Sequence, residues 1–376
     1  MKKFKAGIYI KQDRYKSFQP EFINRQWTLE NIEEIIVLLS RADQELGRLD
    51  MYSKYIPNID IFIDMHVLKE ATQSSKIEGT KTGIEEALLE KEDVPLDRRN
   101  DWEEVQNYIQ AMNEGIKMLE ALPFSSRLIK KTHKILMQGV RGEQKNPGEF
   151  RKSQNWIGGA NINNATFVPP VHTSINDLIN DLEKFIHNEK IYLPELLKIA
   201  IIHYQFETIH PFLDGNGRVG RLLIPLYLVY KGILKKPILY LSDYMEKNRK
   251  DYYDSLTNVR EKNDAARWFK FFLSGIINIA EKGKNTFDNI LQLQQENNLK
   301  TQSLGSRAPN AQKVVNYLYE KPNISAKKVS ELTELSLPSA YKLIEELEKL
   351  DILKEVTGAR RNRIYFFEKY IKLFQS

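Results

Sequence analysis

Apolar residues recur at helical spacing along most of the chain. Ile32, Ile35 and Leu39, for example, stand three or four positions apart, which is the spacing of one face of an α-helix. The same pattern predicts helices over Trp27–Met51, Asp60–Ile77, Trp102–Leu122, Ser125–Met137, Ile175–Asn188, 194–209 and Arg218–Lys231. We therefore expect a mainly α-helical protein.

Two segments interrupt this helical pattern. Residues 151–170 contain WIGGANINNATFVPP, which is rich in Gly and Asn and ends in two prolines, so we expect a short β-hairpin or loop there. Residues 296–310 (ENNLKTQSLGSRAPN) are polar and contain few large apolar side chains. That composition predicts a linker between two domains.

A different pattern follows the predicted linker. Helical spacing covers Ala311–Glu320, Ser325–Thr333 and Leu337–Leu350, and Ile352–Phe367 alternates like two strands around TGARRNR. Three helices followed by a basic hairpin are typical of a winged helix-turn-helix. The predicted organisation is therefore an N-terminal helical region, a core, the linker and a small C-terminal domain, over residues 1–120, 121–295, 296–310 and 311–376.

Length and composition narrow the class of protein. A chain of 376 residues suits two or three domains. Its net charge of +6 is the small difference between 56 Lys and Arg and 50 Asp and Glu, so charge alone indicates no polyanionic partner. The absence of cysteine excludes disulfides, thiol catalysis and cysteine-ligated metals. No stretch approaches the roughly 20 apolar residues of a membrane helix, and the basic N-terminus lacks a signal-peptide core, so we expect a cytoplasmic protein with no membrane partner.

The motif HPFLDGNGRVGR concentrates groups that suit chemistry on a polyphosphate. Gly215, Asn216 and Gly217 can form a tight turn at a helix N-terminus, where backbone N–H groups converge on an anion. Arg218 and Arg221 are three residues apart, so on a helix they share a face. Each can hold phosphate oxygens through its forked N–H groups.

Two further groups of the motif suit the same chemistry. Asp214 can hold Mg²⁺, which usually takes one or two carboxylates together with substrate phosphates. His210 stands just before the turn and can act as a base near neutral pH. Elsewhere, His203 is interpreted as structural and His133 shows no metal-ligand spacing. The motif is neither a Walker A loop, since no GK[ST] follows the glycines, nor a Rossmann fingerprint, since a predicted helix precedes it.

The motif matches HPFx[D/E]GNGRxxR at every defined position, and the chain thereby resembles the Fic-domain family. The resemblance implies the Fic fold, a helical bundle with a β-hairpin flap, and a protein adenylyltransferase. Such an enzyme uses ATP and Mg²⁺ to place AMP on a Tyr, Thr or Ser hydroxyl of a target protein or of itself, and it releases pyrophosphate. Gly217 favours AMP transfer, because Doc-type relatives that transfer phosphate carry Lys there. Transfer of another phosphate-linked group stays an alternative.

The resemblance also implies roles for individual residues. His210 would take the proton of the attacking hydroxyl, and Asp214 would hold Mg²⁺. The glycine turn and the Asn216 side chain would stabilise the α-phosphate, and the two arginines would hold the β/γ end. The ATP site would comprise Gly215, Asn216, Gly217, Arg218, Val219, Gly220 and Arg221, with Tyr252 or Tyr253 at the base or ribose. A tyrosine-rich helix face packed in the core is the alternative for the last two residues.

The flap is the third part of the site that the resemblance implies. Residues 151–170 would cover the active site and register the target protein by adding its backbone as a strand. Ile157, Gly158 and Gly159 are the flap residues expected to approach the target, since glycine permits close contact. An ordinary surface hairpin is the alternative.

A second motif, SSKIEGT, lies far upstream at the end of a predicted helix. Ser74 and Glu78 are four residues apart and so share a helix face. The string matches the inhibitory motif [S/T]xxxE[G/N] of Fic proteins. The resemblance implies that Glu78 reaches Arg221 and displaces the γ-phosphate, which would inhibit the enzyme. The same glutamate could also help remove AMP from the target, and a solvated helix end is the plain alternative.

The C-terminal domain offers a second class of function, a DNA-binding regulator. The helix over 337–350 would then be the recognition helix, with Arg360, Arg361 and Arg363 at the tip of the wing. Residues 308–376 hold 12 Lys and Arg against 9 Asp and Glu, a net of only 12 − 9 = +3, and DNA-binding domains usually have a clearer basic patch. Docking to a protein or formation of a dimer by this domain is at least as well supported, and the family resemblance separately implies a homodimer. A non-catalytic scaffold is disfavoured because no motif residue is missing.

Overall fold

The computed structural model describes residues 5–27, 32–55, 59–139, 142–358 and 363–375, so residues 28–31 of the first predicted helix lie outside the described residues. Each helix predicted from the apolar spacing is present, with ends shifted by a few residues. The elements before the motif are β1 (Gly7–Lys11), β2 (Lys16–Pro20), α1 (Ile32–Tyr55), α2 (Ile59–Ile77), α3 (Ile84–Ala87), α4 (Arg99–Leu119), α5 (Ser126–Leu136), α6 (Ile175–His187) and α7 (Glu195–Ile209). Those that follow are α8 (Asn216–Tyr230), α9 (Ser242–Lys247), α10 (Arg249–Lys262), α11 (Ala265–Gln302), α12 (Ala308–Glu320), β3 (Asn323–Ser325), α13 (Ala326–Thr333), α14 (Leu337–Lys349), β4 (Lys354–Glu355), β5 (Ile364–Phe366) and α15 (Glu368–Lys372).

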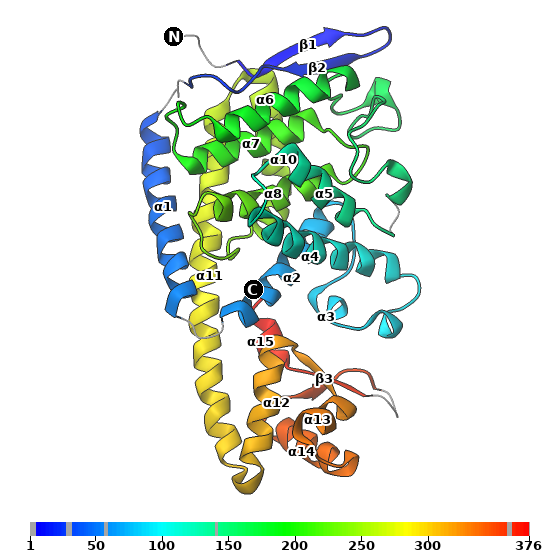
Figure 1. Cartoon of the computed structure of the whole chain (residues 1–376), viewed down its shortest axis with the longest axis vertical. Coiled ribbons are helices and arrows are strands. Elements are labelled where there is room, and N and C mark those ends of the chain that lie inside the picture. The colour runs from blue at the N-terminus through cyan, green and yellow to red at the C-terminus, as the bar shows by residue number, and fades with distance from the viewer. Residues whose placement is uncertain (1–4, 28–31, 56–58, 140–141, 359–362, 376) are drawn as a thin grey trace.

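Helix α11 joins a main lobe, formed by β1 to α11, to a C-terminal lobe, formed by α12 to α15 (Figure 1). It packs along α1 and continues without a break to the C-terminal lobe. The segment 296–310, predicted as a linker, is largely helical: residues 296–302 belong to α11 and residues 308–310 to α12. The helix tolerates these polar residues because they bond to α12. The Asn297 amide donates to the Tyr319 hydroxyl (3.2 Å), and the Thr301 hydroxyl donates to a side-chain oxygen of α12 (2.9 Å).

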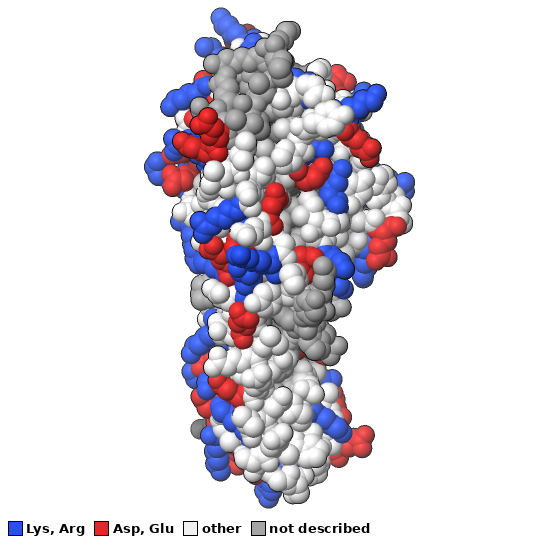
Figure 2. Space-filling view, turned by 90° about the vertical axis from the view of Figure 1, so that its left-hand side faces the viewer, with Lys and Arg blue, Asp and Glu red and all other residues white. Residues whose placement is uncertain are grey.

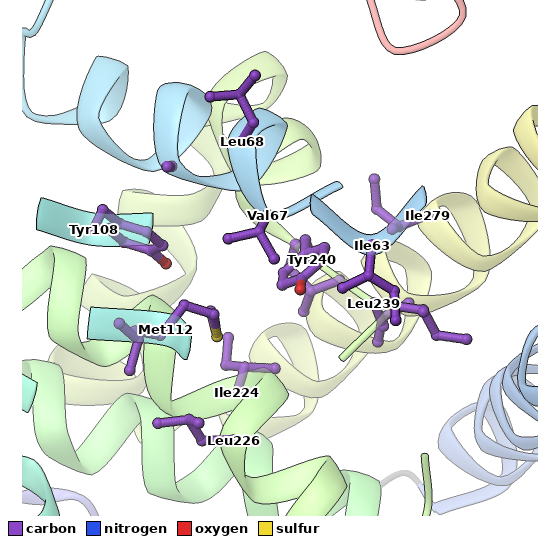
Figure 3. Close-up of a cluster of buried hydrophobic side chains, with 14 of the residues drawn as sticks. Ile63, Val67, Leu68, Tyr108, Met112, Ile224, Leu226, Leu239, Tyr240 and Ile279 are labelled. Atoms are coloured by element: carbon purple, nitrogen blue, oxygen red, sulfur yellow. The ribbon is translucent and has the colours of Figure 1, made fainter. Parts of the chain in front are cut away.

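Helix α2 lies in the part of the main lobe next to the C-terminal lobe (Figure 1). In Figure 3, Val67 of α2 lies in one apolar cluster with Met112 of α4 and Ile224 of α8. Removing these side chains from water is the main force that holds the helices together. Because α2 is buried among α4, α8 and α9, the residues at its C-terminal end have a defined position relative to the start of α8.

The C-terminal lobe contains the three helices and the strand pair that the sequence predicts. Strand β5 pairs antiparallel with both β4 and β3, which gives a sheet of order β3–β5–β4. The third strand, β3, directly precedes α13 and pairs through Ile324 with Tyr365. Arg360 and Arg361, at the tip of the predicted hairpin, lie outside the described residues.

The two lobes meet at the N-terminal half of α2. The buried ring of Phe62 makes edge contacts with Tyr319 and Tyr370, with ring centroids 6.1 and 6.4 Å apart. We expect Phe62→Ala to cost about 3–5 kcal/mol of stability, the usual range for a buried phenylalanine, in urea unfolding of the full chain. Phe22→Ala, at a side chain 53% exposed, is the control and should change stability by no more than about 0.5 kcal/mol. Equal losses of stability in the two variants would contradict a large contribution from the contact of Phe62 with the C-terminal lobe.

An N-terminal hairpin and the flap form one small layer at the far end of the main lobe. Strands β1 and β2, which the sequence pattern does not predict, pair from Gly7–Pro20 to Lys11–Lys16. The flap contains one β-bridge, between Ile157 and Phe167, and a short 3₁₀ turn over Ile162–Asn164. The Phe18 N–H donates to the Val168 carbonyl (2.9 Å), so strand β2 supports one arm of the flap.

The surface carries charges of both signs, as the small net charge predicts. Figure 2 shows Lys and Arg intermingled with Asp and Glu on the face of the main lobe that it presents. Within the described parts of the chain, none of the helices combines the length and the apolar character needed to span a bilayer.

Candidate active site

The motif forms the loop between α7 and α8, where two residues adopt left-handed backbone conformations. His210 ends α7 with φ 49°, and Gly215 precedes α8 with φ 75°. Such a φ is rare for a residue with a side chain and is held by the surrounding structure. Helix α8 begins at Asn216, so the N–H groups of its first turn have no partner within the helix and can bind an anion.

Side chains brace this loop from both sides. The Asn216 amide accepts from the Phe212 N–H (2.8 Å) and donates to the Phe212 carbonyl (2.9 Å). Both ends of this amide are therefore bonded to the loop backbone, and its expected role at the α-phosphate stays a prediction. The ring of Phe212 stacks on His133 with centroids 3.7 Å apart.

His133 is a structural part of the site that the sequence pattern does not reveal. Its Nδ1 accepts from the Gly148 N–H (2.8 Å), and its Nε2 lies 3.0 Å from the Asp214 carbonyl, to which it can donate. Burial lowers the pKa of His133 to about 4, so the ring is neutral and can accept at one nitrogen and donate at the other. It thereby fixes the backbone at Asp214.

Asp214 can contribute one carboxylate to a metal. Its Oδ1 accepts from the Gly215 N–H (2.6 Å), while its side chain stays 48% exposed. Among the described residues there is no cluster of three or more His, Cys, Asp or Glu that could hold a metal ion. The donor set therefore fits Mg²⁺ shared with substrate phosphates and water, rather than a metal enclosed by protein ligands.

Arg221 is held by the upstream motif. Its guanidinium, 1% exposed, donates from Nε to the Ser74 hydroxyl and from Nη2 to the Ser74 carbonyl, both at 2.9 Å. The same Nη2 donates to Glu78 Oε1 at 2.7 Å. Among the described residues its buried Nη1 has no hydrogen-bond partner. The structure thus brings Glu78 to Arg221, as the resemblance implies, and leaves one donor of the arginine unused.

The Glu78 carboxylate lies over the first turn of α8. A Cβ at Gly217 would collide with Glu78 Oε1, so the glycine provides the space that the carboxylate uses. Burial would raise the pKa of Glu78, but the charge and hydrogen bond of Arg221 outweigh it and lower the pKa. The carboxylate is therefore ionised at neutral pH and occupies an anion site made by Arg221 and a helix N-terminus.

Arg218 has a different carboxylate partner. Its Nη1 lies 3.2 Å from Oε2 of Glu104 on α4, and both side chains are buried. The Thr80 hydroxyl donates to the same Glu104 oxygen (3.1 Å). The guanidinium also lies 3.9 Å from Asp214. No local sequence signal marks Glu104, because its role depends on the packing of α4 against α8.

The tyrosines expected at the nucleotide base differ in burial. Tyr252 is buried among aromatic rings, and its hydroxyl bonds to His203 (2.8 Å). Its burial places it in the core, which is the alternative that the sequence leaves open for this residue. Tyr253 is 41% exposed and stays a candidate. His203 is structural, as predicted, because its other ring nitrogen bonds to the Gly220 carbonyl (2.9 Å).

A buried glutamate lies behind the loop. Burial raises the pKa of Glu207 to about 7, and a Cβ at Gly220 would collide with its Oε1. Gly220 therefore allows α7 and α8 to approach each other. Gly220 serves the packing of the two helices, and Val219 is fully buried. Neither role places its residue against a nucleotide.

The flap glycines have conformations that favour glycine. Gly158 and Gly159 have φ values of 68° and 72°, and side chains there would collide with Thr166 and Asn164. The Ile157 N–H and carbonyl both bond to Phe167. The backbone of Ile157 is therefore bonded to the opposite arm of the flap and is not free to bond to a target.

The pKa of His210 predicts the pH dependence of catalysis by a base at this position. Burial and the nearby Arg151 guanidinium lower the pKa of His210 to about 4, although Glu78 opposes the shift. A base works when it is deprotonated, so activity should persist as pH falls past the ordinary histidine value of 6.5 and be lost toward pH 4. The measurement is kcat/KM against pH in a Glu78→Gly variant, with circular dichroism at each pH. Half-loss near pH 6.5 would contradict it.

Two family models match the chain in adjacent segments. The N-terminal model of the Fic/DOC family covers residues 36–117, and the Fic/DOC family model covers residues 123–228. The first therefore includes the Ser74–Glu78 motif, and the second includes the loop between α7 and α8.

Individual relatives agree with these matches. A probable protein adenylyltransferase of Aquifex aeolicus is 30% identical over 255 residues, which cover 65% of this chain and 73% of that protein. Protein adenylyltransferase Fic of Aedes aegypti is 34% identical over 125 residues, covering 33% of this chain and 22% of that protein. A Fic family protein from Desulfovibrio desulfuricans G20 shares the fold, with a TM-score of 0.56 and 18% identity over 91% of this chain and 97% of the other. The chain with the HPFLDGNGRVGR loop belongs to the Fic/DOC family.

Proposed function

We propose that this protein is an adenylyltransferase that moves AMP from ATP to a hydroxyl of a target protein or of its own chain. The observation that carries the proposal is the place of the Glu78 carboxylate. It binds Arg221 at the N-terminus of α8, and a nucleotide phosphate would use the same donors. His210 lies at the other end of the same loop.

The proposed reaction is a displacement at the α-phosphorus of ATP. The attacking hydroxyl oxygen bonds to that phosphorus, the bond to the α,β-bridging oxygen breaks, and pyrophosphate leaves with the electron pair. His210 accepts the hydroxyl proton, for which its lowered pKa keeps it neutral. The first-turn N–H groups of α8 stabilise the developing negative charge. Asp214 would hold Mg²⁺, which when bound supplies positive charge beside the phosphates.

We further propose that Glu78 inhibits this reaction. The Glu78 carboxylate, bonded to Arg221 Nη2 and lying beside Gly217, fills the place that the γ-phosphate would take. ATP would then bind with its α-phosphate displaced from the line of attack. A displacement of about 1 Å is enough to slow a reaction by about a hundredfold. Glu78 lies in the turn directly after α2, so a trigger that displaces the end of this helix would remove Glu78 from Arg221.

The flap would receive the target as an added strand. In an antiparallel pair, alternate residues turn their N–H and carbonyl groups toward opposite neighbours. Since Ile157 faces Phe167, the N–H and carbonyl groups of Trp156 would face the target, while Gly158, with φ 68°, leaves the extended conformation. The flap would therefore present the backbone of Trp156 rather than that of Ile157, which refines the expectation from the sequence.

For the C-terminal lobe we propose a winged helix that docks protein rather than DNA. The expected recognition helix, α14, carries Glu345 and Glu346, and Glu346 is paired with Arg307. Carboxylates on the face of a recognition helix oppose contact with DNA phosphates.

The experiment for the proposed function compares two labelled forms of ATP. A Glu78→Gly protein, incubated with α-labelled ATP and Mg²⁺, should acquire protein-bound label that survives denaturing electrophoresis, with a mass increase of one AMP. The same protein with γ-labelled ATP should stay unlabelled. Label from the γ position would show phosphate transfer, and label from neither would reject the proposal.

A further inference from the structure

Arg151 lies where the flap begins, and its side chain is almost completely buried, with 3% of the residue exposed. Together with its own backbone N–H, its guanidinium reaches carbonyl groups of both the motif and the flap. Nothing in the local sequence singles out this arginine, because its partners come from segments that are distant along the chain.

The first set of partners is the end of α7. Arg151 Nε donates to the His210 carbonyl (3.0 Å), Nη2 reaches the Ile209 carbonyl (3.5 Å), and the backbone N–H donates to the Pro211 carbonyl (2.8 Å). The last carbonyls of a helix lack partners within it and form the negative end of its dipole. A buried guanidinium therefore satisfies them and stabilises the left-handed conformation of His210.

The second set of partners is the two ends of the flap. Arg151 Nη1 donates to the Ser153 carbonyl (3.1 Å), and Nη2 donates to the Pro170 carbonyl (2.5 Å). The planar guanidinium offers five N–H donors in fixed directions. One rigid group thus ties the first and last residues of the segment 153–170 to the backbone of His210.

Other contacts hold the middle of the flap but do not reach His210. The Phe18 N–H bonds to Val168, and the Arg260 guanidinium lies 4.1 Å from the centroid of the Phe167 ring. These contacts set where one arm of the flap lies on the surface. The distance between the flap and the catalytic loop depends on the shared bonds of Arg151 and on one further bond, in which the Asn155 amide donates to the Phe212 carbonyl (2.9 Å). Of these two side chains, only Arg151 bonds to the His210 carbonyl.

We propose that Arg151 is a positioning residue that fixes the flap relative to His210, so that a target strand on the flap presents its hydroxyl to the base. This inference rests on the proposed function, because it assumes that the flap holds the target and that His210 accepts the proton. Without the bonds of Arg151, the flap would still hold the target and α7 would still hold His210, but the target hydroxyl would not be aligned with the base. A misplacement of about 1 Å would slow transfer by about a hundredfold.

The test compares Arg151→Met and Arg151→Lys in the Glu78→Gly background. Methionine removes every side-chain donor, while lysine keeps the charge and donors that can reach some of the carbonyls. Self-labelling from α-labelled ATP should fall by about a hundredfold in Arg151→Met and recover in part in Arg151→Lys. Binding of a non-hydrolysable ATP analogue, measured by calorimetry, should be unchanged in both. Labelling and analogue binding that fall together would indicate a general structural defect and overturn the proposal, as would undiminished labelling.

A matched control and a second readout complete the test. Arg99 also donates to two loop carbonyls, those of Val94 and Glu92 (both 3.1 Å), but it touches neither flap nor motif, so Arg99→Met should keep full labelling. Hydrogen exchange is independent of catalysis: amides of residues 153–170 should exchange faster in Arg151→Met, while α6 should not change. Unchanged flap exchange would overturn the tether. If the Glu78→Gly protein itself acquires no label, the proposed function is wrong. The hydrogen exchange of residues 153–170 in Arg151→Met then still tests whether Arg151 holds the flap.

Discussion

In a Glu78→Gly variant, incorporation of AMP from α-labelled ATP should rise by about a hundredfold over the wild-type chain, since realigning reacting groups by about 1 Å changes the rate by about that factor. The carboxylate holds Arg221 Nη2 and fills the space beside Gly217. Its removal leaves the guanidinium bonded, among the described residues, to Ser74 alone and clears the first turn of α8 for the β/γ phosphates. The measurement is the initial rate of labelling at saturating ATP and Mg²⁺.

Two control variants distinguish the effect of removing the carboxylate from the effect of loosening the end of α2. Lys76→Gly places a glycine two residues earlier, at a side chain that is 55% exposed, and should stay at the wild-type rate. Glu78→Gln keeps the shape but loses the charge, so its rate should lie between those of wild type and Glu78→Gly. Equal activation by Lys76→Gly would assign the effect to a loosened helix end.

The binding of ATP offers an independent check on the same contact. A ligand that binds only the folded protein raises the thermal midpoint according to its affinity. ATP should therefore stabilise Glu78→Gly more than it stabilises the wild-type chain, because only the variant lacks the carboxylate that occupies the anion site at Arg221 and the start of α8. An equal thermal shift in the two proteins would show that Glu78 does not compete with the nucleotide.

His210→Ala should abolish transfer in the Glu78→Gly background, because a positioned general base contributes about 10²–10⁴-fold to the rate. His210 is partly buried at the end of α7, and its lowered pKa keeps it neutral. Binding of a non-hydrolysable ATP analogue should be largely retained, because the donors at Arg221 and the start of α8 are unchanged.

The control for this loss is a histidine outside the site. His172, exposed in the 3₁₀ turn just before α6, can be replaced by Ala without loss of labelling if His210 is the base. Transfer that persists in His210→Ala would reject this role, and loss of analogue binding would assign His210 to the nucleotide site instead.

The sequence predicts the parts of the site that are contiguous or that carry a motif. The loop from His210 to Arg221 can be placed between two helices because its glycines and apolar flanks are local signals. The contact of Glu78 with Arg221 was expected only through the family resemblance, since no periodicity relates residues so far apart. The structure confirms the contact itself.

The residues that brace the site could not be predicted in this way. His133, Arg151 and Glu104 act through bonds to segments 59 to 114 residues away, and such bonds depend on how the helices pack. Tyr252 was ambiguous because a buried and a ligand-binding tyrosine have the same sequence pattern. The polar composition of residues 296–302 likewise predicts a linker, but these residues continue α11, because side chains of α12 supply hydrogen-bond partners.

The most direct measurement of the central claim compares α-label incorporation by three proteins in one experiment: the wild-type chain, Glu78→Gly and Glu78→Gly with His210→Ala. An AMP transferase inhibited by Glu78 and dependent on His210 predicts strong labelling of the second protein alone. Equal labelling of the first two proteins would contradict inhibition by Glu78, and strong labelling of the third would contradict catalysis by His210.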